Sequence, residues 1–184
     1  MTPYTTGARL GELLALRYGA VDFDKGSITI HSGRAEVIEG FADTEPKTDA
    51  GNRTISLTGH ALAILREHRK KWLEQRVWLG AAWQGEKDGY VFPNQVGGQL
   101  GHATVEHAWR VLLAKAGLPV IRFHDLRHTA ASLMLLAGVP VAEVSRMLGH
   151  SSPHITYKIY AHSIPSAQHQ AVAAMEAILG ERHA

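Results

Sequence analysis

Hydrophobic positions recur at helical spacing along most of the chain. Leu10, Leu13 and Leu14 fall on one face of a predicted helix in the segment 6–19, for which Gly19 is a stop signal. Beyond the N-cap residue Thr58, the same periodicity predicts a helix to about residue 77 and further helices at 104–116, 124–137, 140–148, 153–160 and within 166–179. The chain is therefore predicted to be mainly helical.

Two short segments carry the β-branched residues that are typical of strands. "GSITI" (26–30) and "RTISL" (53–57) each follow a turn-forming stretch, and a further strand is expected around 35–41. Together they predict a small antiparallel sheet. The predicted class is α+β, mainly α, with this antiparallel β-sheet on one flank.

Composition limits the possibilities further. The 184 residues fit one domain, and we expect residues 1–184 to form a single unit. The sequence holds neither a long apolar run nor a signal-peptide pattern, so we expect a cytoplasmic protein without a membrane partner. The absence of cysteine excludes disulfides and cysteine-zinc sites. A formal net charge of +2 is too small to indicate a nucleic-acid partner by itself.

The predicted helix 124–137 carries unusual residues in its first turn, namely His124, Arg127 and His128. Its apolar stripe is expected to face the core and consists of Leu126, Ala130, Leu133 and Ala137. His124 and Arg127 share a different face and are expected to point together into a cleft. A purely structural alternative is that Arg127 pairs with a carboxylate and His124 caps the helix.

A metal site on this helix is disfavoured. His124 and His128 have the i, i+4 spacing of paired metal ligands, but the first histidine is not followed by the glutamate of an HExxH motif. No third ligand has a diagnostic spacing either. We therefore expect neither a metal nor a cofactor.

Four motifs follow one another along the chain: "TGARLGE" (6–12), "PKTDAGNRTISL" (46–57), "FHDLRHTAASLMLLAGVP" (123–140) and "LGHSSPHITYKIYAH" (148–162). In this order, with the predicted helices and strands between them, the chain resembles the catalytic domain of the tyrosine recombinases, the phage-integrase family. The resemblance covers nearly all of the sequence. It implies the fold of that domain and a site-specific DNA recombinase or integrase.

The resemblance also implies a complete set of site residues. The catalytic ones are Arg9, Lys47, His124, Arg127, His150 and the nucleophile Tyr160, and Glu12 matches an acidic residue that supports the site. Guanidinium groups suit such a role because each can donate paired hydrogen bonds to phosphate oxygens. Tyrosine would attack phosphorus and form a 3′-phosphotyrosyl link, while Lys47 would protonate the departing 5′ oxygen. Because that link keeps the energy of the broken bond, rejoining needs no nucleotide.

Three of these assignments have alternatives. Tyr157 lies three residues before Tyr160, and helical spacing alone leaves the two close, so Tyr160 is favoured by its step of ten residues from "LGH". Lys47, as a turn lysine, could simply be solvated. His128 and His162 are interpreted as structural or close to DNA.

Family members carry a helical DNA-binding domain and an apolar helix upstream of "TGARLGE", and we expect this chain to lack both. That departure keeps two other functions open: a non-catalytic DNA-binding remnant and, more remotely, a type IB-like topoisomerase. The expected partners are double-stranded DNA and other copies of the chain, four on paired sites. The expected location is the cytoplasm, at the nucleoid.

Overall fold

The computed structural model describes residues 3–31, 34–37, 40–43, 52–86, 88–163 and 175–176. Its α-helices are α1 (Pro3–Thr6), α2 (Leu10–Leu14), α3 (Gly59–Leu79), α4 (His102–Lys115), α5 (Asp125–Leu136), α6 (Val141–Leu148) and α7 (Pro153–Tyr160). The strands are β1 (Val21–Asp22), β2 (Ser27–Ile30), β3 (Arg34–Val37), β4 (Gly40–Asp43) and β5 (Arg53–Ser56). Short 3-10 helices are η1 (Tyr18–Ala20), η3 (Gly80–Ala82) and η4 (Ala161–Ser163). The predicted class, mainly helical with a small antiparallel sheet, is confirmed.

The main sheet is antiparallel, with the strand order β1-β2-β5. β2 and β5 are the predicted strands, and they pair Ile28 with Ile55 and Ile30 with Arg53. The single strand expected around 35–41 is wrong in detail. Strands β3 and β4 form a separate antiparallel two-stranded sheet, in which Val37 pairs with Gly40.

Helix α2 is shorter than the hydrophobic pattern predicts, since it ends at Leu14 and not near Gly19. Between α2 and η1, Arg17 forms an isolated antiparallel bridge with Tyr90, in a distant segment. The N–H of Tyr18 donates to the carbonyl of Gly89 (3.1 Å), and the N–H of Val91 donates to the carbonyl of Leu16 (2.8 Å). These bonds between residues far apart in sequence override the local helical spacing.

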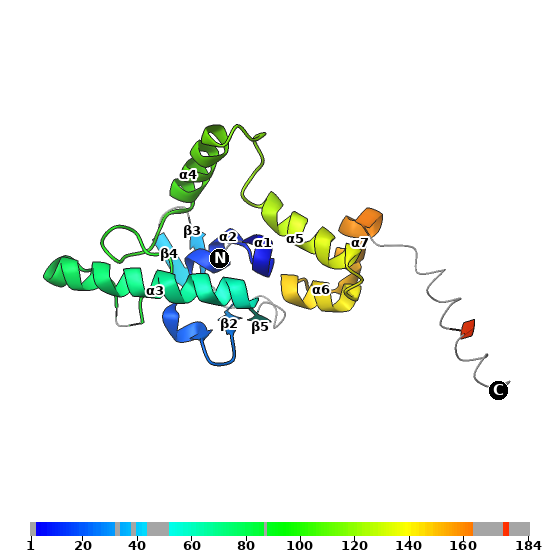
Figure 1. Cartoon of the computed structure of the whole chain (residues 1–184), viewed down its shortest axis with the longest axis horizontal. Coiled ribbons are helices and arrows are strands. Elements are labelled where there is room, and N and C mark those ends of the chain that lie inside the picture. The colour runs from blue at the N-terminus through cyan, green and yellow to red at the C-terminus, as the bar shows by residue number, and fades with distance from the viewer. Residues whose placement is uncertain are drawn as a thin grey trace.

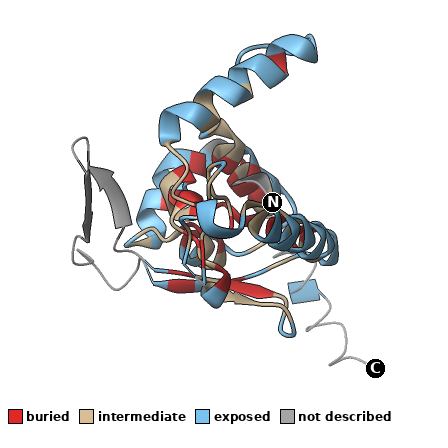
Figure 2. Cartoon of the chain, turned by 90° about the vertical axis from the view of Figure 1, so that its left-hand side faces the viewer, coloured by how far each residue is buried: buried red, intermediate tan, exposed pale blue. Residues whose placement is uncertain are grey.

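The remaining helices lie within a few residues of their predicted bounds. Thr58 caps α3 as expected, because its Oγ1 accepts a hydrogen bond from the N–H of Ala61 (3.2 Å). α3 runs across the sheet, whereas α4 projects away from the body and is mostly exposed (Figures 1 and 2). Of the predicted last helix, only Met175 and Glu176 belong to the described residues, and they are helical.

Buried residues form two clusters. One lies between α3 and the sheet and includes Ile28, Ile55 and Leu65. The other lies between α5, α6 and α7, at the opposite end of the molecule in Figure 1, and includes Leu135 and Leu148. Helix α1 packs on α5, and α6 contacts β5, so these two contacts link the two halves of the molecule that hold the clusters.

The orientation of α5 corrects the predicted stripe. Leu133 is 46% exposed, and Ala137, just beyond the helix, is also exposed; the buried positions are Arg127, Ala130, Ala131 and Leu135. Arg127, Ala131 and Leu135 are spaced by four, so they share one helix face. The arginine thus lies on the core-facing side and not on a separate polar face.

None of the helices in the described ranges is long and apolar enough to span a membrane.

Candidate active site

The first site residue, Arg9, lies at the N-terminus of α2 and is fixed by the carboxylate of Glu12. The backbone N–H of Arg9 donates to Glu12 Oε2 (2.7 Å), and its Nη1 donates to Glu12 Oε1 (2.8 Å). Its Nη2 reaches the carbonyl of Gly149 at 3.4 Å, 140 positions further along the chain. The Arg9 side chain is 44% exposed, so it is anchored at this place and still faces solvent.

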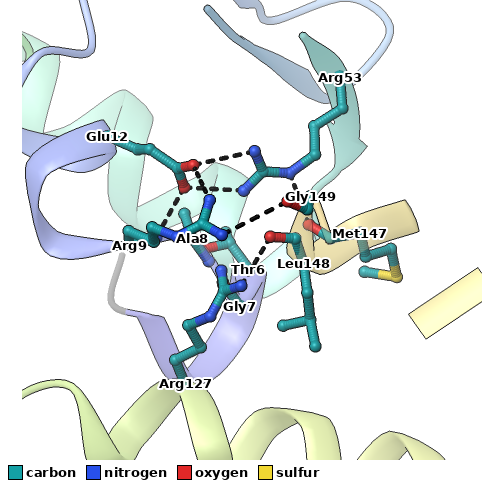
Figure 3. Close-up of polar contacts among 10 residues, drawn as sticks. All are labelled: Thr6, Gly7, Ala8, Arg9, Glu12, Arg53, Arg127, Met147, Leu148 and Gly149. Atoms are coloured by element: carbon teal, nitrogen blue, oxygen red, sulfur yellow. Dashed lines mark hydrogen bonds and ion pairs between the residues drawn. The ribbon is translucent and has the colours of Figure 1, made fainter. Parts of the chain in front are cut away.

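The same carboxylate binds a second guanidinium, that of Arg53 on β5 (Figure 3). Arg53 Nη1 and Nη2 donate to the two oxygens of Glu12 at 3.0 and 2.8 Å, and its Nε donates to the carbonyl of Met147 at 2.7 Å. The Arg53 side chain is only 3% exposed. It is buried because it shares the inward face of β5 with Ile55, two residues on.

Electrostatics keep Glu12 ionised. Burial by itself would raise the pKa of Glu12, but hydrogen bonds and charge from Arg53, together with Arg9, outweigh it and lower the pKa. A single carboxylate therefore holds one buried arginine and one exposed arginine.

Arg127 is buried and bonds to backbone only. Its Nη1 donates to the carbonyl of Gly7, and its Nη2 donates to the carbonyl of Leu148 (2.7 Å). Burial, and next the charge of Arg9, lower the pKa of Arg127 to about 10, so it stays cationic at neutral pH. Within the described ranges no carboxylate forms an ion pair with it, and only the more distant charge of Glu12 partly offsets its positive charge.

Two glycines of the motifs allow these close approaches. Gly149 follows α6 with φ +66°, and a Cβ there would lie 2.6 Å from Arg53 Nη1. Gly7 has φ +65°, and a Cβ there would lie 2.8 Å from a methyl carbon of Leu148. Both positions need the left-handed backbone that glycine adopts without strain.

His150 follows this turn and is attached to α7. Its Nδ1 lies 2.8 Å from Oγ1 of the buried Thr156. Burial, followed by the charges of Arg127 and Arg9, lowers the pKa of His150 to about 4. The imidazole is therefore neutral at physiological pH and has one N–H to donate.

Helix α7 carries the two candidate tyrosines, and they differ sharply in exposure. Ser152 caps this helix, with Pro153 in its first turn. Tyr157 is 57% exposed, whereas Tyr160 is 2% exposed and packs against residues of α5 and α6.

The hydroxyl of Tyr160 lies 2.7 Å from Nδ1 of His128. Burial raises the pKa of this phenol, and the charge of Arg127 opposes the rise. The His128 ring is in turn in edge-on contact with the ring of His124, at 5.1 Å between centroids. Partial burial, then the charges of His128 and Arg127, lower the pKa of His124.

The structure thus brings most of the predicted site residues to one place. Arg9, Glu12, Arg127 and His150 meet around the 7–12 and 148–150 segments, and Tyr160 with His124 lies beside them on α7 and α5. The predicted lysine, Lys47, lies outside the described residues, as does the side chain of His162. Arg127 does not pair with a carboxylate of the described ranges, and the His124 side chain makes no capping bond.

Two residues that bond to predicted site residues were not assigned to the site from the sequence: Arg53 was not considered, and His128 was interpreted as structural or close to DNA. Arg53 has a visible signal, because the alternation in "RTISL" places it on the same face as Ile55. His128 has none, since its partner Tyr160 lies 32 positions away. In the parts of the chain that the structure describes, no three histidine, aspartate or glutamate side chains are grouped closely enough to bind a metal ion.

Comparisons with known proteins identify the family of the chain. The phage integrase family model matches residues 1–166. A tyrosine recombinase XerC-like protein of Caldanaerobacter subterraneus is 31% identical over 179 residues, covering 92% of this chain and 46% of the relative.

Solved structures give the same answer. The crystal structure of XerA recombinase is 26% identical, with a TM-score of 0.67, and the match covers 95% of this chain and 54% of that one. The Tn1549 transposon integrase in complex with circular intermediate DNA is 21% identical, with a TM-score of 0.74, covering 96% and 57%; it shares the fold. The chain therefore spans about half the length of the relatives that it matches. On these grounds, the chain belongs to the phage integrase family.

Proposed function

We propose that residues 1–184 form the catalytic domain of a site-specific DNA recombinase that cleaves and rejoins DNA through a 3′-phosphotyrosyl intermediate. One observation carries the proposal. Arg9 and Arg127 come from elements far apart in sequence, yet both donate to the carbonyls of the Leu148–Gly149 turn. Two guanidiniums fixed at one turn are suited to bind a single phosphate.

Charge favours an anion at this place. Three guanidiniums, those of Arg9, Arg53 and Arg127, lie around the carboxylate of Glu12, which in the described network forms ion pairs with Arg9 and Arg53 but not with Arg127. A buried cation without a counter-ion is costly, so a phosphate beside Arg127 would be stabilised strongly. Such groups accelerate cleavage to the extent that they bind the five-coordinate transition state better than the resting phosphate.

Each remaining residue has a role in this reaction. The neutral His150 and His124 would donate N–H bonds to the non-bridging oxygens, and Tyr160 would attack phosphorus. Lys47 would protonate the 5′ oxygen as it leaves. The arginines supply the charge stabilisation that a metal ion supplies in other phosphoryl-transfer enzymes.

The proposed substrate is double-stranded DNA; DNA is also the ligand named for the transposon integrase with this fold. Strand exchange joins two duplexes, so we propose that copies of the protein assemble as four on paired sites. The same chemistry serves integration, excision and resolution of DNA, and we propose that it takes place in the cytoplasm, at the nucleoid.

Covalent capture tests the proposal even though the DNA site is unidentified. A library of random duplexes, each nicked so that the released fragment diffuses away, is incubated with the protein in EDTA at low salt. DNA that stays bound after SDS is sequenced, and the enriched duplex is resynthesised. The wild type is expected to form a covalent adduct with it, whereas Tyr160→Phe forms none.

Tyr157→Phe is the matched control, because it removes the same atom from the same helix at an exposed position. It should form the adduct at the wild-type rate. If the wild type retains no DNA after SDS, the proposed function is refuted. If Tyr160→Phe retains DNA and Tyr157→Phe does not, the nucleophile is Tyr157 and the assignment of Tyr160 is refuted.

A further inference from the structure

The proton of Tyr160 needs an acceptor if the proposed function is correct. A phenol attacks phosphorus only as its O–H bond breaks, because a neutral phenol is a weak nucleophile. The Tyr160 hydroxyl lies among the side chains of α5 and α6, where burial raises its pKa. Spontaneous ionisation is thus less favourable than in water, and a base must lie next to the oxygen.

Three imidazoles lie near the site, and among the described residues only that of His128 forms a hydrogen bond with the phenol. His128 Nδ1 is 2.7 Å from the Tyr160 hydroxyl oxygen. Nδ1 of His150 is instead engaged by Thr156 at 2.8 Å. His124 contacts the His128 ring edge-on. His128 is therefore the residue placed to take the proton directly.

We infer that His128 is a catalytic residue that accepts the Tyr160 proton during strand cleavage. The imidazole must be the tautomer with hydrogen on Nε2, so that Nδ1 is free to accept. The phenol O–H bond breaks and an N–H bond forms at Nδ1. A bond forms between the phenol oxygen and phosphorus, and the bond from phosphorus to the 5′ oxygen breaks. The 5′ oxygen takes its proton from a separate acid, for which Lys47 is the candidate.

The packing around His128 suits this role. Residue 128 follows Arg127 directly on α5, so the base is held by the same helix as the phosphate-binding guanidinium. The ring contacts both the His124 ring and the Tyr160 ring. In the rejoining step the same nitrogen would return the proton to the departing phenol oxygen, as reversibility requires.

Two substitutions separate proton transfer from positioning. In His128→Asn the amide oxygen can still accept the phenol hydrogen bond, but it cannot take up the proton. His128→Gln places the amide oxygen one bond further from the backbone. It is included so that the conclusion does not depend on how well one replacement side chain fits. The matched control is His60→Asn, at an exposed position on α3 far from Tyr160 in sequence.

The assay measures single-turnover adduct formation on two versions of the captured duplex, one with the normal 5′ oxygen and one with sulfur in its place. A thiolate leaves without a proton, so the sulfur substrate removes the need for an acid and keeps the need for a base. Both His128 variants are expected to be about 100-fold slower or more on both substrates, the usual effect of losing a general base. Lys47→Ala should be slow on oxygen and restored on sulfur, and His60→Asn should match the wild type.

The outcomes are distinct. Equal rates for His128→Asn and the wild type would overturn the inference, because a hydrogen-bond acceptor would then suffice. Faster cleavage by the variants would also overturn it, since the contact would then only restrain the tyrosine. Rescue by sulfur would assign the residue to the leaving group and overturn it as well. A wild type that forms no adduct refutes the proposed function itself, whereas an active wild type confines any failure to His128.

Discussion

Arg53 offers the sharpest test of how the site is held together. It is almost fully buried, and its guanidinium joins α2 to the end of α6 through Glu12 and the carbonyl of Met147. The perturbation is Arg53→Gln, which removes the charge and the fork while keeping a polar chain of moderate length. We expect loss of both stability and cleavage, although Arg53 touches no substrate in the proposed reaction.

The magnitude follows from burial. Removing one partner of a buried ion pair costs about 3–5 kcal/mol, because the other charge is left without compensation. Glu12 keeps Arg9, whose side chain is 44% exposed, so the lower end of that range applies. For a chain of this size each kcal/mol corresponds to about 2–4 °C, which gives a melting temperature lower by about 6–12 °C. Arg53→Lys should fall in between, since one ammonium cannot bridge both carboxylate oxygens and Met147.

Thermal unfolding measures this loss, and a double-mutant cycle with Glu12→Gln assigns it to the pair. The combined variant should lose less than the sum of the two single variants, by about 1–3 kcal/mol. The control is Glu143→Gln on α6, whose partner Arg146 is exposed, and its melting temperature should not change measurably. Two results would contradict this reasoning. One is a melting temperature of Arg53→Gln equal to that of the Glu143→Gln control. The other is a combined variant whose loss of stability equals the sum of the two single losses, because the Glu12–Arg53 pair would then not join α2 to the end of α6.

Three further predictions concern neighbouring residues. Gly149→Ala should lower the free energy of unfolding, measured with urea, by at least about 1–2 kcal/mol, because alanine is strained in the left-handed backbone and its methyl group would clash with the Arg53 guanidinium. The control is Gly59→Ala, whose methyl group would contact no other atom and should leave stability unchanged. Equal effects of the two substitutions would contradict the packing at Gly149. The free energy of unfolding should fall as the pH drops from 6.5 to about 4, because His150 stays neutral in the folded protein and takes up a proton in the unfolded chain. His150→Asn should reduce the slope of stability against pH in this range. An unchanged slope would contradict the lowered pKa of His150. Arg127→Lys should slow adduct formation by about 100-fold or more, because one ammonium group cannot donate to both backbone carbonyls and also donate two hydrogen bonds to a phosphate. A near-normal cleavage rate would show that Arg127 does not bind the phosphate.

Hydrophobic period and capping were sufficient to predict most of the fold. Thr58 caps α3 as predicted, and β2 and β5 match the β-branched segments. The errors arise where distant segments bond to one another. Helix α2 stops early because the backbone around Tyr18 bonds to Gly89, and a local pattern contains no information about such a contact.

The site was predictable by resemblance and less so by physical pattern. Leu133 looked like a core position and is 46% exposed, whereas Arg127 looked polar and is 3% exposed. A prediction of the buried face of α5 from hydrophobicity alone therefore selects a different face from the one that is buried in the structure. The buried arginine is tolerated because two backbone carbonyls, at Gly7 and Leu148, accept its hydrogen bonds, and these become available only when three segments have assembled.

The location of the site explains why these polar residues are buried. The sheet with α3 forms one hydrophobic cluster and α5–α7 form the other. Arg53 reaches from β5 to the carbonyl of Met147 on α6, and Arg127 reaches from α5 to the carbonyl of Gly7. Apolar side chains at this place would stabilise the contact between the clusters without the free-energy cost of removing guanidiniums from water. Among the described residues, two buried guanidiniums, those of Arg53 and Arg127, accompany one carboxylate, that of Glu12. This arrangement would suit a protein that binds a phosphate between the two clusters. The same contacts that hold the halves together would then set the spacing between the phosphate and Tyr160, so stability and cleavage are expected to change together whenever Glu12 or Arg53 is altered.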